Sequence, residues 1–163
     1  IPFNQFNTNY ALREITQEFK LIRKLTETKL HTNQIVKRQK GKDRYSDLGP
    51  FKHTQVKLRS KKNAFDTNVD NYINANHIKS AKQRKIFIAT QGPLDKSFIN
   101  FWKMVWQEKV SWIFMLCPLK EGNKNKCSEY WPNENTEKTI KIGEDFLITF
   151  DKQIISDSDI IRQ

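Results

Sequence analysis

Residues 86–116 carry the pattern that most limits the possible folds, because a helix pattern stands there between two strand patterns. From residue 98 to 106 the apolar side chains recur at the i, i+3, i+4, i+7 and i+8 positions, which predicts a firmly buried helix; they are Phe98, Phe101, Trp102, Val105 and Trp106. Asp95 is the expected N-cap of this helix. Residues 86–89 are predicted to form a strand, and residues 112–116 a central strand. The sequence therefore predicts a mixed α and β fold.

Other segments extend this prediction in both directions along the chain. Residues 11–27 show one apolar helical face, which predicts an amphipathic helix. Gly and Pro residues mark a loop over 39–50, and a charged stretch over 60–68 is also loop-like. The remaining patterns predict strands at residues 54–58, at 72–73 and at the end of the chain, and a hairpin over 139–150 that turns at Gly143-Glu144. Because these strands are neighbours in sequence, the sheet is expected to be partly antiparallel, in an α+β or α/β class.

The composition is that of one globular domain with a strong excess of positive charge. Of the 163 residues 37% are hydrophobic and 29% are charged, and the formal net charge is +11. Such a charge favours anionic partners, namely phosphorylated or acidic peptides, nucleic acid or an anionic membrane. Basic side chains that merely solvate the surface would give the same total. The aromatic residues are spaced as core and are not interleaved with Lys and Arg, so nucleic acid is not the expected partner.

Two other functional classes find little support in the sequence. The longest nearly apolar run, residues 110–119, is about half of the roughly 20 residues that a membrane helix needs. The two Cys and three His residues do not have zinc-ligand spacing, so neither a metal nor another cofactor is expected. No secretory signal opens the sequence, which favours reduced thiols and a cytoplasmic location of the protein, or of the cytoplasmic part of a longer one.

Five motifs resemble, in order and in spacing, those of the phosphotyrosine-specific protein-tyrosine phosphatases. The first, Lys-Asp-Arg-Tyr-Ser-Asp followed by Pro-Phe, is similar to the loop of that family that recognises phosphotyrosine; the five lie at residues 42–51, 71–76, 87–94, 101–106 and 115–132. The resemblance implies a mixed, highly twisted β-sheet flanked by helices. It also implies that residues 1–163 are the N-terminal portion of one phosphatase domain. Within it, residues 1–38 would be a helical lead-in, and residues 39–163 the recognition loop and sheet core.

The resemblance assigns substrate binding to three neighbouring residues of the loop. Tyr45 is expected to stack on the phosphotyrosine ring, which contributes about 0.5–1.5 kcal/mol. Asp47 is expected to accept a hydrogen bond from a substrate backbone amide. Ser46 stands between them, where relatives often carry a basic or larger residue. Judged from this loop alone, a Tyr packed on its own domain and a solvated Asp remain the alternative.

The resemblance also implies supporting roles for residues other than Tyr45, Ser46 and Asp47. Arg44 would face inward and tie the loop to the body, and Asn74 and Gln91 would support neighbouring backbone. Glu121 would orient the arginine of a phosphate-binding loop, and Lys126 would face the mobile loop that bears the catalytic acid. Two solvated charges in a Gly- and Asn-rich turn are the alternative for this last pair.

No catalytic residue is expected within residues 1–163. A phosphatase nucleophile needs backbone N–H groups around it and an Arg six residues later. Cys117 and Cys127 are instead followed at that distance by Asn123 and Asn133, so both are predicted to be buried thiols. The chain also carries Asp43 where relatives commonly have Asn.

The function implied by the resemblance is hydrolysis of phosphotyrosine in proteins or peptides through a cysteinyl-phosphate. The alternative is a catalytically inactive module that binds phosphotyrosine. Residues 1–163 stop before the phosphate-binding loop of the family. We therefore expect the coding sequence to continue for roughly a hundred residues or more, with a Trp-Pro-Asp segment first and a His-Cys loop closed by Arg later.

Overall fold

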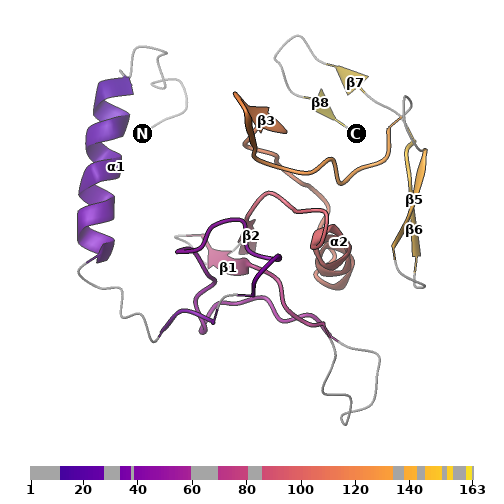
Figure 1. The fold of residues 1–163 in the computed structure, drawn as a ribbon, viewed down its shortest axis with the longest axis horizontal. Helices are drawn as coiled ribbons and strands as arrows, with labels where there is room; N and C mark the ends of the chain where they lie inside the picture. Colours follow the sequence, from indigo (N-terminus) through magenta and orange to yellow (C-terminus); the bar gives the residue numbers. More distant parts are fainter. Residues whose placement is uncertain are drawn as a thin grey trace. The chain divides into compact units, whose positions relative to one another are not determined.

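A computed structural model describes most of the chain: residues 12–27, 34–37, 39–59, 70–80, 86–133, 138–142, 146–151, 154–155 and 161–162 (Figure 1). The chain divides into two compact units, Ile1–Ile35 and Val36–Gln163, and each is described by itself. The loop predicted over residues 60–68 lies outside the described residues. No described helix is long and apolar enough to span a bilayer.

The first unit contains helix α1, Leu12–Glu27, which confirms the amphipathic helix predicted over residues 11–27. Glu14 in its first turn and Lys24 in its last turn complement the helix dipole. The apolar stripe of Ile15, Phe19 and Leu25 is more than half exposed. Burial in the first unit therefore does not explain this stripe.

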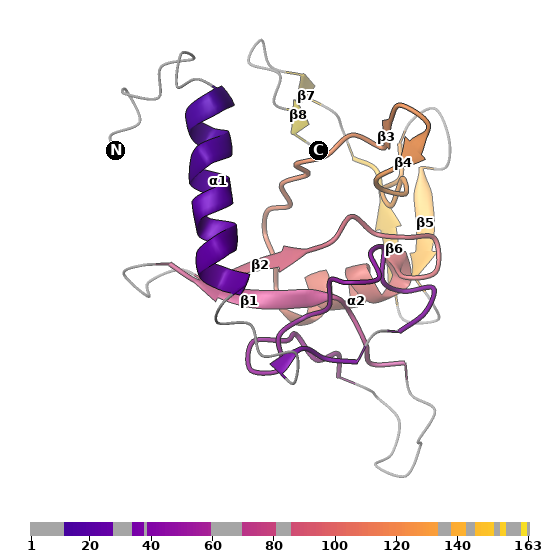
Figure 2. The same cartoon turned by 60° about the vertical axis from the view of Figure 1, so that its left-hand side comes forward.

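The second unit is built around an antiparallel strand pair, β1 (Ala75–Lys79) and β2 (Ile86–Thr90), which Figure 2 shows side by side. The predicted strand at 72–73 is therefore displaced by a few residues along the chain. Residues 54–58 run beside β1, where the N–H of Val56 donates to Ala75 O at 2.9 Å. They form only an isolated bridge and no full strand, but the predicted alternation of burial holds: Val56 and Leu58 are buried and Lys57 is exposed.

Helix α2, Phe98–Gln107, confirms the predicted buried helix and packs on this strand pair. Its N-cap is Ser97 and not Asp95, because the N–H of Ser97 closes a turn onto Leu94 O at 2.8 Å before the helix begins. Asp95 is exposed in that turn. The core cluster around the helix comprises Val56, Leu58, Ile73, Ala75, Phe101, Met104, Cys127 and Tyr130. Trp106, which the helical pattern placed in the core, is 73% exposed.

The central strand predicted at residues 112–116 is wrong. These residues have no strand pairing within the described part of the chain. Their side chains are exposed on both faces: Trp112 is 68% exposed, Phe114 75% and Leu116 95%, and the alternating Ile113 and Met115 are 41% and 37% exposed. The apolar pattern is that of a strand covered on both sides, but a strand also needs neighbours that pair with its backbone. Nothing in the apolar pattern itself says which strands those would be.

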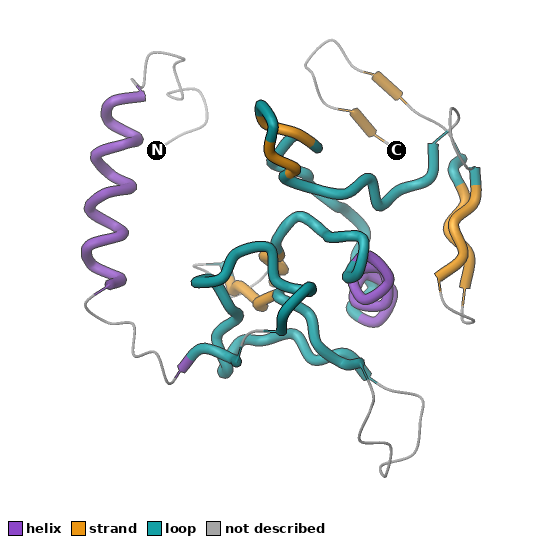
Figure 3. Tube along the Cα trace, in the orientation of Figure 1, coloured by secondary structure: helices purple, strands orange, loops and turns teal. Residues whose placement is uncertain are grey.

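The remaining strands form short antiparallel hairpins (Figure 3). Strand β3 (Lys120–Glu121) pairs with β4 (Lys124–Asn125), and β7 (Ile154–Ile155) pairs with β8 (Ile161–Arg162). The predicted hairpin over 139–150 is confirmed as β5 (Thr139–Ile142) and β6 (Phe146–Thr149), although its turn lies outside the described residues. The mixed α and β class is thus confirmed, with the described strands distributed over four two-stranded sheets.

Candidate functional site

The loop predicted over residues 39–50 begins with a tight turn. The N–H groups of Lys42 and Asp43 donate to Gln39 O at 3.0 and 3.2 Å. Gly41 lies in the turn with φ +86°, a left-handed conformation that glycine adopts without strain. Beyond the turn, Arg44 is partly buried and residues 45–47 are exposed.

Arg44 fastens this loop to two other segments. Its guanidinium donates to three backbone carbonyls: Nε to Gly92 O at 3.1 Å, Nη2 to Pro93 O at 2.8 Å and Nη1 to Asn125 O at 2.9 Å. A planar guanidinium suits this task because its N–H groups point in fixed, diverging directions. The three bonds join the loop to residues 92–93 and to the end of β4; the supporting role of Arg44 in a binding site remains a prediction.

The side chains of Gln91 and Asn74 form hydrogen bonds to the backbone of the same loop. Gln91 Nε2 donates to Lys42 O at 2.6 Å, and Gln91 Oε1 accepts from the N–H of Arg44 at 2.9 Å. Asn74 Nδ2 donates to Leu48 O at 2.8 Å. Gln91 thus binds backbone atoms before Tyr45, and Asn74 binds a backbone atom after it. The loop is therefore held on both sides of Tyr45.

Asp43 is a buried member of this network that the sequence analysis missed. It is only 6% exposed. Its Oδ1 accepts from Tyr72 Oη at 2.6 Å and from Asn74 Nδ2 at 3.1 Å, and its Oδ2 accepts from the N–H of Gln39 at 2.8 Å. All three neighbours are donors, which suits a carboxylate. Burial, the hydrogen bond to Asp43 and the charge of that carboxylate raise the pKa of Tyr72 well above its usual value.

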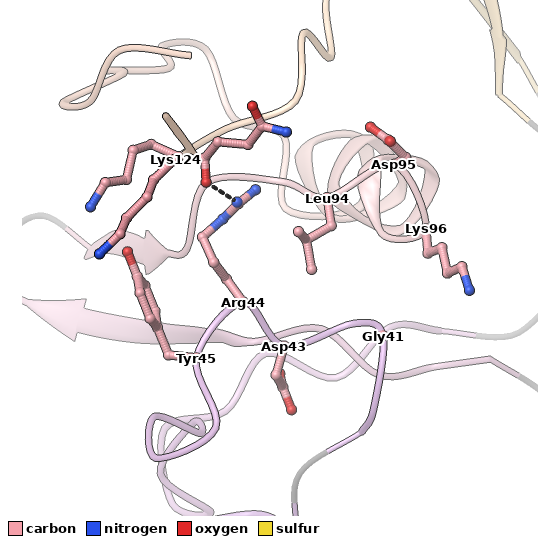
Figure 4. Close-up of a pocket in the computed structure, with 10 residues that line it drawn as sticks. Gly41, Asp43, Arg44, Tyr45, Leu94, Asp95, Lys96 and Lys124 are labelled. Carbon is pink, nitrogen blue, oxygen red and sulfur yellow. Dashed lines mark hydrogen bonds between the residues drawn. The ribbon is translucent and has the colours of Figure 1, made fainter. Parts of the chain in front are cut away.

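The three predicted substrate-binding residues project from this anchored loop. Tyr45, Ser46 and Asp47 are all exposed, Tyr45 to 43%. Figure 4 shows the Tyr45 ring at the edge of a cavity, with the Arg44 guanidinium beside it. The cavity has a volume of about 670 Å³ and is lined by side chains that lie within residues 41–45, 94–96 and 124–126. The arrangement offers an aromatic face and basic groups to a ligand.

Glu121 and Lys126, predicted as a functional pair, bind each other across the β3–β4 hairpin. Glu121 Oε2 lies 2.8 Å from Lys126 Nζ. The hydrogen bond and the opposite charge lower the pKa of Glu121 and raise the pKa of Lys126. Both groups are therefore charged at neutral pH, and Lys126 lines the same cavity as Tyr45.

The two cysteines differ in burial. Cys127 is buried, as predicted, whereas Cys117 is only partly buried. Burial and the neighbouring Cys117 raise the pKa of Cys127 to about 11. A thiol with a raised pKa is a poor nucleophile at neutral pH, because the thiolate is the reactive form. The described residues also bring together no cluster of His, Cys, Asp and Glu that could hold a metal ion.

Alkylation of Cys127 in the folded protein is expected to be about 100-fold slower at pH 8 than alkylation of the same thiol after unfolding. The pKa rises from 9.0 to about 11, so the thiolate fraction falls by about that factor. The folded-state rate should keep rising with pH up to about 11. The measurement is iodoacetamide labelling of the protein with both cysteines present, followed by digestion and mass spectrometry of the peptide that contains Cys127, with the same protein in urea as control. Equal folded and unfolded rates would contradict the prediction.

Comparisons with known proteins identify the family of the chain. A family model described as "Protein-tyrosine phosphatase" matches residues 39–163. The chain is 38% identical over 138 residues to a receptor-type tyrosine-protein phosphatase of Caenorhabditis elegans, and 40% identical over 123 residues to the human tyrosine-protein phosphatase non-receptor type 12. These matches cover 82% and 71% of this chain, and 10% and 15% of the two relatives.

Solved structures with a similar fold are also protein tyrosine phosphatases. The chain is similar to the catalytic domain of human protein tyrosine phosphatase non-receptor type 18, with a TM-score of 0.73 and 28% identity over 92% of this chain and 54% of that one. A structure of PTPN18 in complex with HER2 phosphopeptides gives a TM-score of 0.72 and 28% identity, over 90% and 51% of the two chains. The chain thus spans about half of the solved domains that it matches. Together with the five sequence motifs, these matches show that the chain is part of a phosphatase domain and belongs to the protein-tyrosine phosphatase family.

Proposed function

We propose that residues 1–163 supply the phosphotyrosine-recognition loop and the framework of a domain that hydrolyses phosphotyrosine in proteins or peptides. The observation that carries the proposal is the loop around Tyr45, whose backbone is held by Arg44, Gln91 and Asn74 while its own side chains face solvent. A rigid support with exposed binding groups is what recognition of a long, rigid side chain requires. The phosphopeptides bound to PTPN18 in the similar structure support the same ligand class.

In this proposal Tyr45 stacks on the phosphotyrosine ring, and Asp47 accepts a hydrogen bond from the substrate backbone. Arg44, Lys124 and Lys126 place positive charge beside the ring, which favours approach of a dianionic phosphate. Ser46, being exposed between the two binding residues, contacts the substrate next to the phosphotyrosine.

The chemical steps use groups that residues 1–163 do not contain. Neither cysteine has an Arg six residues later, and the one Trp-Pro pair is followed by Asn133. In the family a cysteine thiolate attacks phosphorus while an Asp protonates the leaving tyrosine, and water then hydrolyses the cysteinyl-phosphate. Glu121 would orient the arginine of that phosphate-binding loop, and Lys126 would face the loop that carries the Asp.

We also place the domain in the cytoplasm, as a whole protein or as the cytoplasmic part of a longer one. Both cysteines are free thiols, which suits a reducing compartment. Relatives include receptor-type and non-receptor phosphatases, so either arrangement is compatible with the family.

Tyr45→Ala in a complete domain is expected to lower kcat/KM for phosphotyrosine peptides by roughly twofold to twelvefold. This range corresponds to a lost ring stack of about 0.5–1.5 kcal/mol. The loss should appear mainly as a higher KM. Tyr45→Phe is the matched control, because it keeps the ring and should retain kcat/KM. If Tyr45→Ala leaves kcat/KM unchanged, the loop has only a structural role.

A catalytically inactive module that binds phosphotyrosine is the second candidate, since the exposed side chains of the Tyr45 loop would serve binding without catalysis equally well. The deciding experiment incubates the complete domain with a phosphotyrosine peptide and measures both released phosphate and bound peptide. Vanadate-sensitive release of phosphate supports the enzyme. Saturable binding without release would support the binding module. With either result, binding that is unchanged in Tyr45→Ala would reject the recognition role of the loop.

A further inference from the structure

The Asp43 carboxylate lies behind the Tyr45 loop and outside its binding face. Although Asp43 contributes to the lining of the cavity, the residue is only 6% exposed. Figure 4 shows its side chain pointing to the opposite side of the loop from the side chains of Arg44 and Tyr45. A ligand that stacks on Tyr45 therefore does not touch this carboxylate, and Asp43 can affect binding only through the loop.

Three donors converge on this carboxylate. Its Oδ1 accepts from Tyr72 Oη at 2.6 Å and from Asn74 Nδ2 at 3.1 Å, and its Oδ2 accepts from the N–H of Gln39 at 2.8 Å. A carboxylate offers only acceptors, whereas the amide of Asn offers one acceptor and one donor group. Since relatives commonly carry Asn at this position, the carboxylate is a departure of this chain.

Asn74 carries the constraint to the far end of the loop. Its Nδ2 donates to Leu48 O at 2.8 Å as well as to Asp43, and Gln91 Oε1 lies 3.4 Å away. All three neighbours of this NH2 group are acceptors, so the amide has one favourable orientation. Because Nδ2 is bound by Asp43, it is also held where it reaches the carbonyl of Leu48, three residues after Tyr45.

Gln39 carries the constraint to the near end of the loop. Its N–H donates to Asp43 Oδ2, while its carbonyl accepts from the N–H groups of Lys42 and Asp43 at 3.0 and 3.2 Å. The turn at residues 39–43 is therefore closed by the side chain of Asp43 as well as by its backbone. One buried carboxylate thus acts on both sides of Tyr45.

An amide at position 43 cannot serve both ends. If its NH2 group takes the place of Oδ2, it meets the N–H of Gln39, and two donors face each other. If it takes the place of Oδ1, it meets Nδ2 of Asn74, which could turn its amide only by giving up Leu48 O. The hydroxyl of Tyr72 can rotate to accept, but it does not reach the loop backbone for either of them. Either orientation therefore loses one of the two bonds that hold the loop.

We propose that Asp43 is a positioning residue for phosphotyrosine recognition, whose carboxylate keeps residues 44–48 in the binding conformation through Gln39 and Asn74. The proposal rests on the proposed function of this loop and adds to it a residue that touches no substrate. A loop that occupies the binding conformation for only a fraction of the time binds with an affinity reduced in proportion to that fraction. The chemical step uses groups that lie elsewhere in a complete domain, so its rate is not expected to change.

In Asp43→Asn, made in a complete domain, KM for a phosphotyrosine peptide is expected to rise roughly twofold to tenfold while kcat stays the same. The factor corresponds to the loss of one hydrogen bond that holds the loop. Charge alone predicts the opposite sign, because removal of a negative charge beside the site favours a dianionic phosphate. Asp95→Asn is the matched control: it makes the same chemical change at an exposed carboxylate of the same cavity and should not raise KM.

Tyr72→Phe separates positioning from stability. It removes one donor from Asp43 but keeps the bonds to Gln39 and Asn74. Both Asp43→Asn and Tyr72→Phe are expected to lower the urea midpoint of unfolding, because each breaks a buried hydrogen bond. Only Asp43→Asn should raise KM.

Hydrogen exchange of the side-chain amide of Asn74, followed by NMR, reports on the loop directly. In the unchanged domain these protons are expected to exchange more slowly than those of the exposed Asn71. The difference should shrink in Asp43→Asn and persist in Tyr72→Phe. Equal exchange at Asn74 and Asn71 in the unchanged domain would overturn the proposal even if Asp43→Asn failed to fold.

The outcomes separate this proposal from the proposed function. If Tyr45→Ala raises KM and Asp43→Asn does not, the positioning role of Asp43 is rejected and recognition by the loop is retained. An equal rise of KM in Tyr72→Phe would reduce Asp43 to a structural residue and would also overturn the proposal. If exchange at Asn74 accelerates in Asp43→Asn while KM is unchanged there and in Tyr45→Ala, Asp43 holds a loop that does not recognise phosphotyrosine, and the proposed function is the part that fails.

Discussion

Purified residues 1–163 are expected to release no phosphate from phosphotyrosine peptides or aryl phosphates above the rate in buffer. Formation of a phosphoenzyme needs a thiolate, and burial raises the pKa of Cys127 to about 11. The second thiol, Cys117, lies in the sequence Leu116-Cys117-Pro118, without the glycines and the arginine that surround a phosphate-binding cysteine. Since the missing groups act together, the loss is expected to be complete and not partial.

The measurement is phosphate release from a phosphotyrosine peptide over several hours at high protein concentration, with a complete domain of the family as positive control. Vanadate is added in a parallel sample to identify any contaminating phosphatase. Vanadate-sensitive turnover that persists through further purification and disappears in Cys127→Ser would contradict the prediction and would make Cys127 the nucleophile.

Gly92→Ala is expected to destabilise a complete domain by about 3 kcal/mol, a large part of the 5–15 kcal/mol that holds a typical domain together. A Cβ at Gly92 would lie 2.6 Å from Lys126 O and 3.2 Å from Cys127 Cβ. The backbone oxygen that it meets cannot turn aside as a flexible side chain could. Either segment must shift, and a shift at residue 92 would also disturb the bonds from Arg44 to Gly92 O and Pro93 O.

Gly122→Ala is the matched control for this substitution. Gly122 has φ +55° in the β3–β4 turn, and an added Cβ there meets nothing within 4 Å. Its cost is limited to the strain of a left-handed residue, about 1 kcal/mol. Urea unfolding of both variants measures the difference. A loss from Gly92→Ala that is no larger than the loss from Gly122→Ala would contradict the close packing of residues 92 and 126.

Local sequence patterns were sufficient to predict both helices and one β-hairpin. The three- and four-residue spacing predicted α1 and α2, and the alternation of Ile140 and Ile142 with Phe146 and Ile148 predicted the β5–β6 pair. The same reasoning failed for residues 112–116, because an apolar run does not say which strands will pair with it. It also misplaced the N-cap of α2, where the turn closed by Ser97 onto Leu94 takes precedence over Asp95.

The residues of the candidate site were likewise only partly predictable from the sequence. The resemblance to the family pointed to Arg44, Asn74 and Gln91, and each of them forms hydrogen bonds to backbone atoms; their supporting roles remain predictions. Asp43 was noticed only as an unusual residue, since its donors Tyr72 and Asn74 are about 30 residues away in sequence. No local pattern links residues that become neighbours only after folding.

The Arg44 side chain has one more consequence, which concerns entropy. Its three bonds join the Tyr45 loop to the segment at residues 92–93 and to the end of β4. The conformational freedom of the loop is therefore lost when the domain folds, so that, under the proposed function, binding of a peptide would not carry that entropic cost. The same bonds make local opening of β4 and release of the loop one cooperative event. Bound phosphopeptide should accordingly slow amide hydrogen exchange at Lys126, whose N–H donates to Leu119 O at 2.8 Å within the protein.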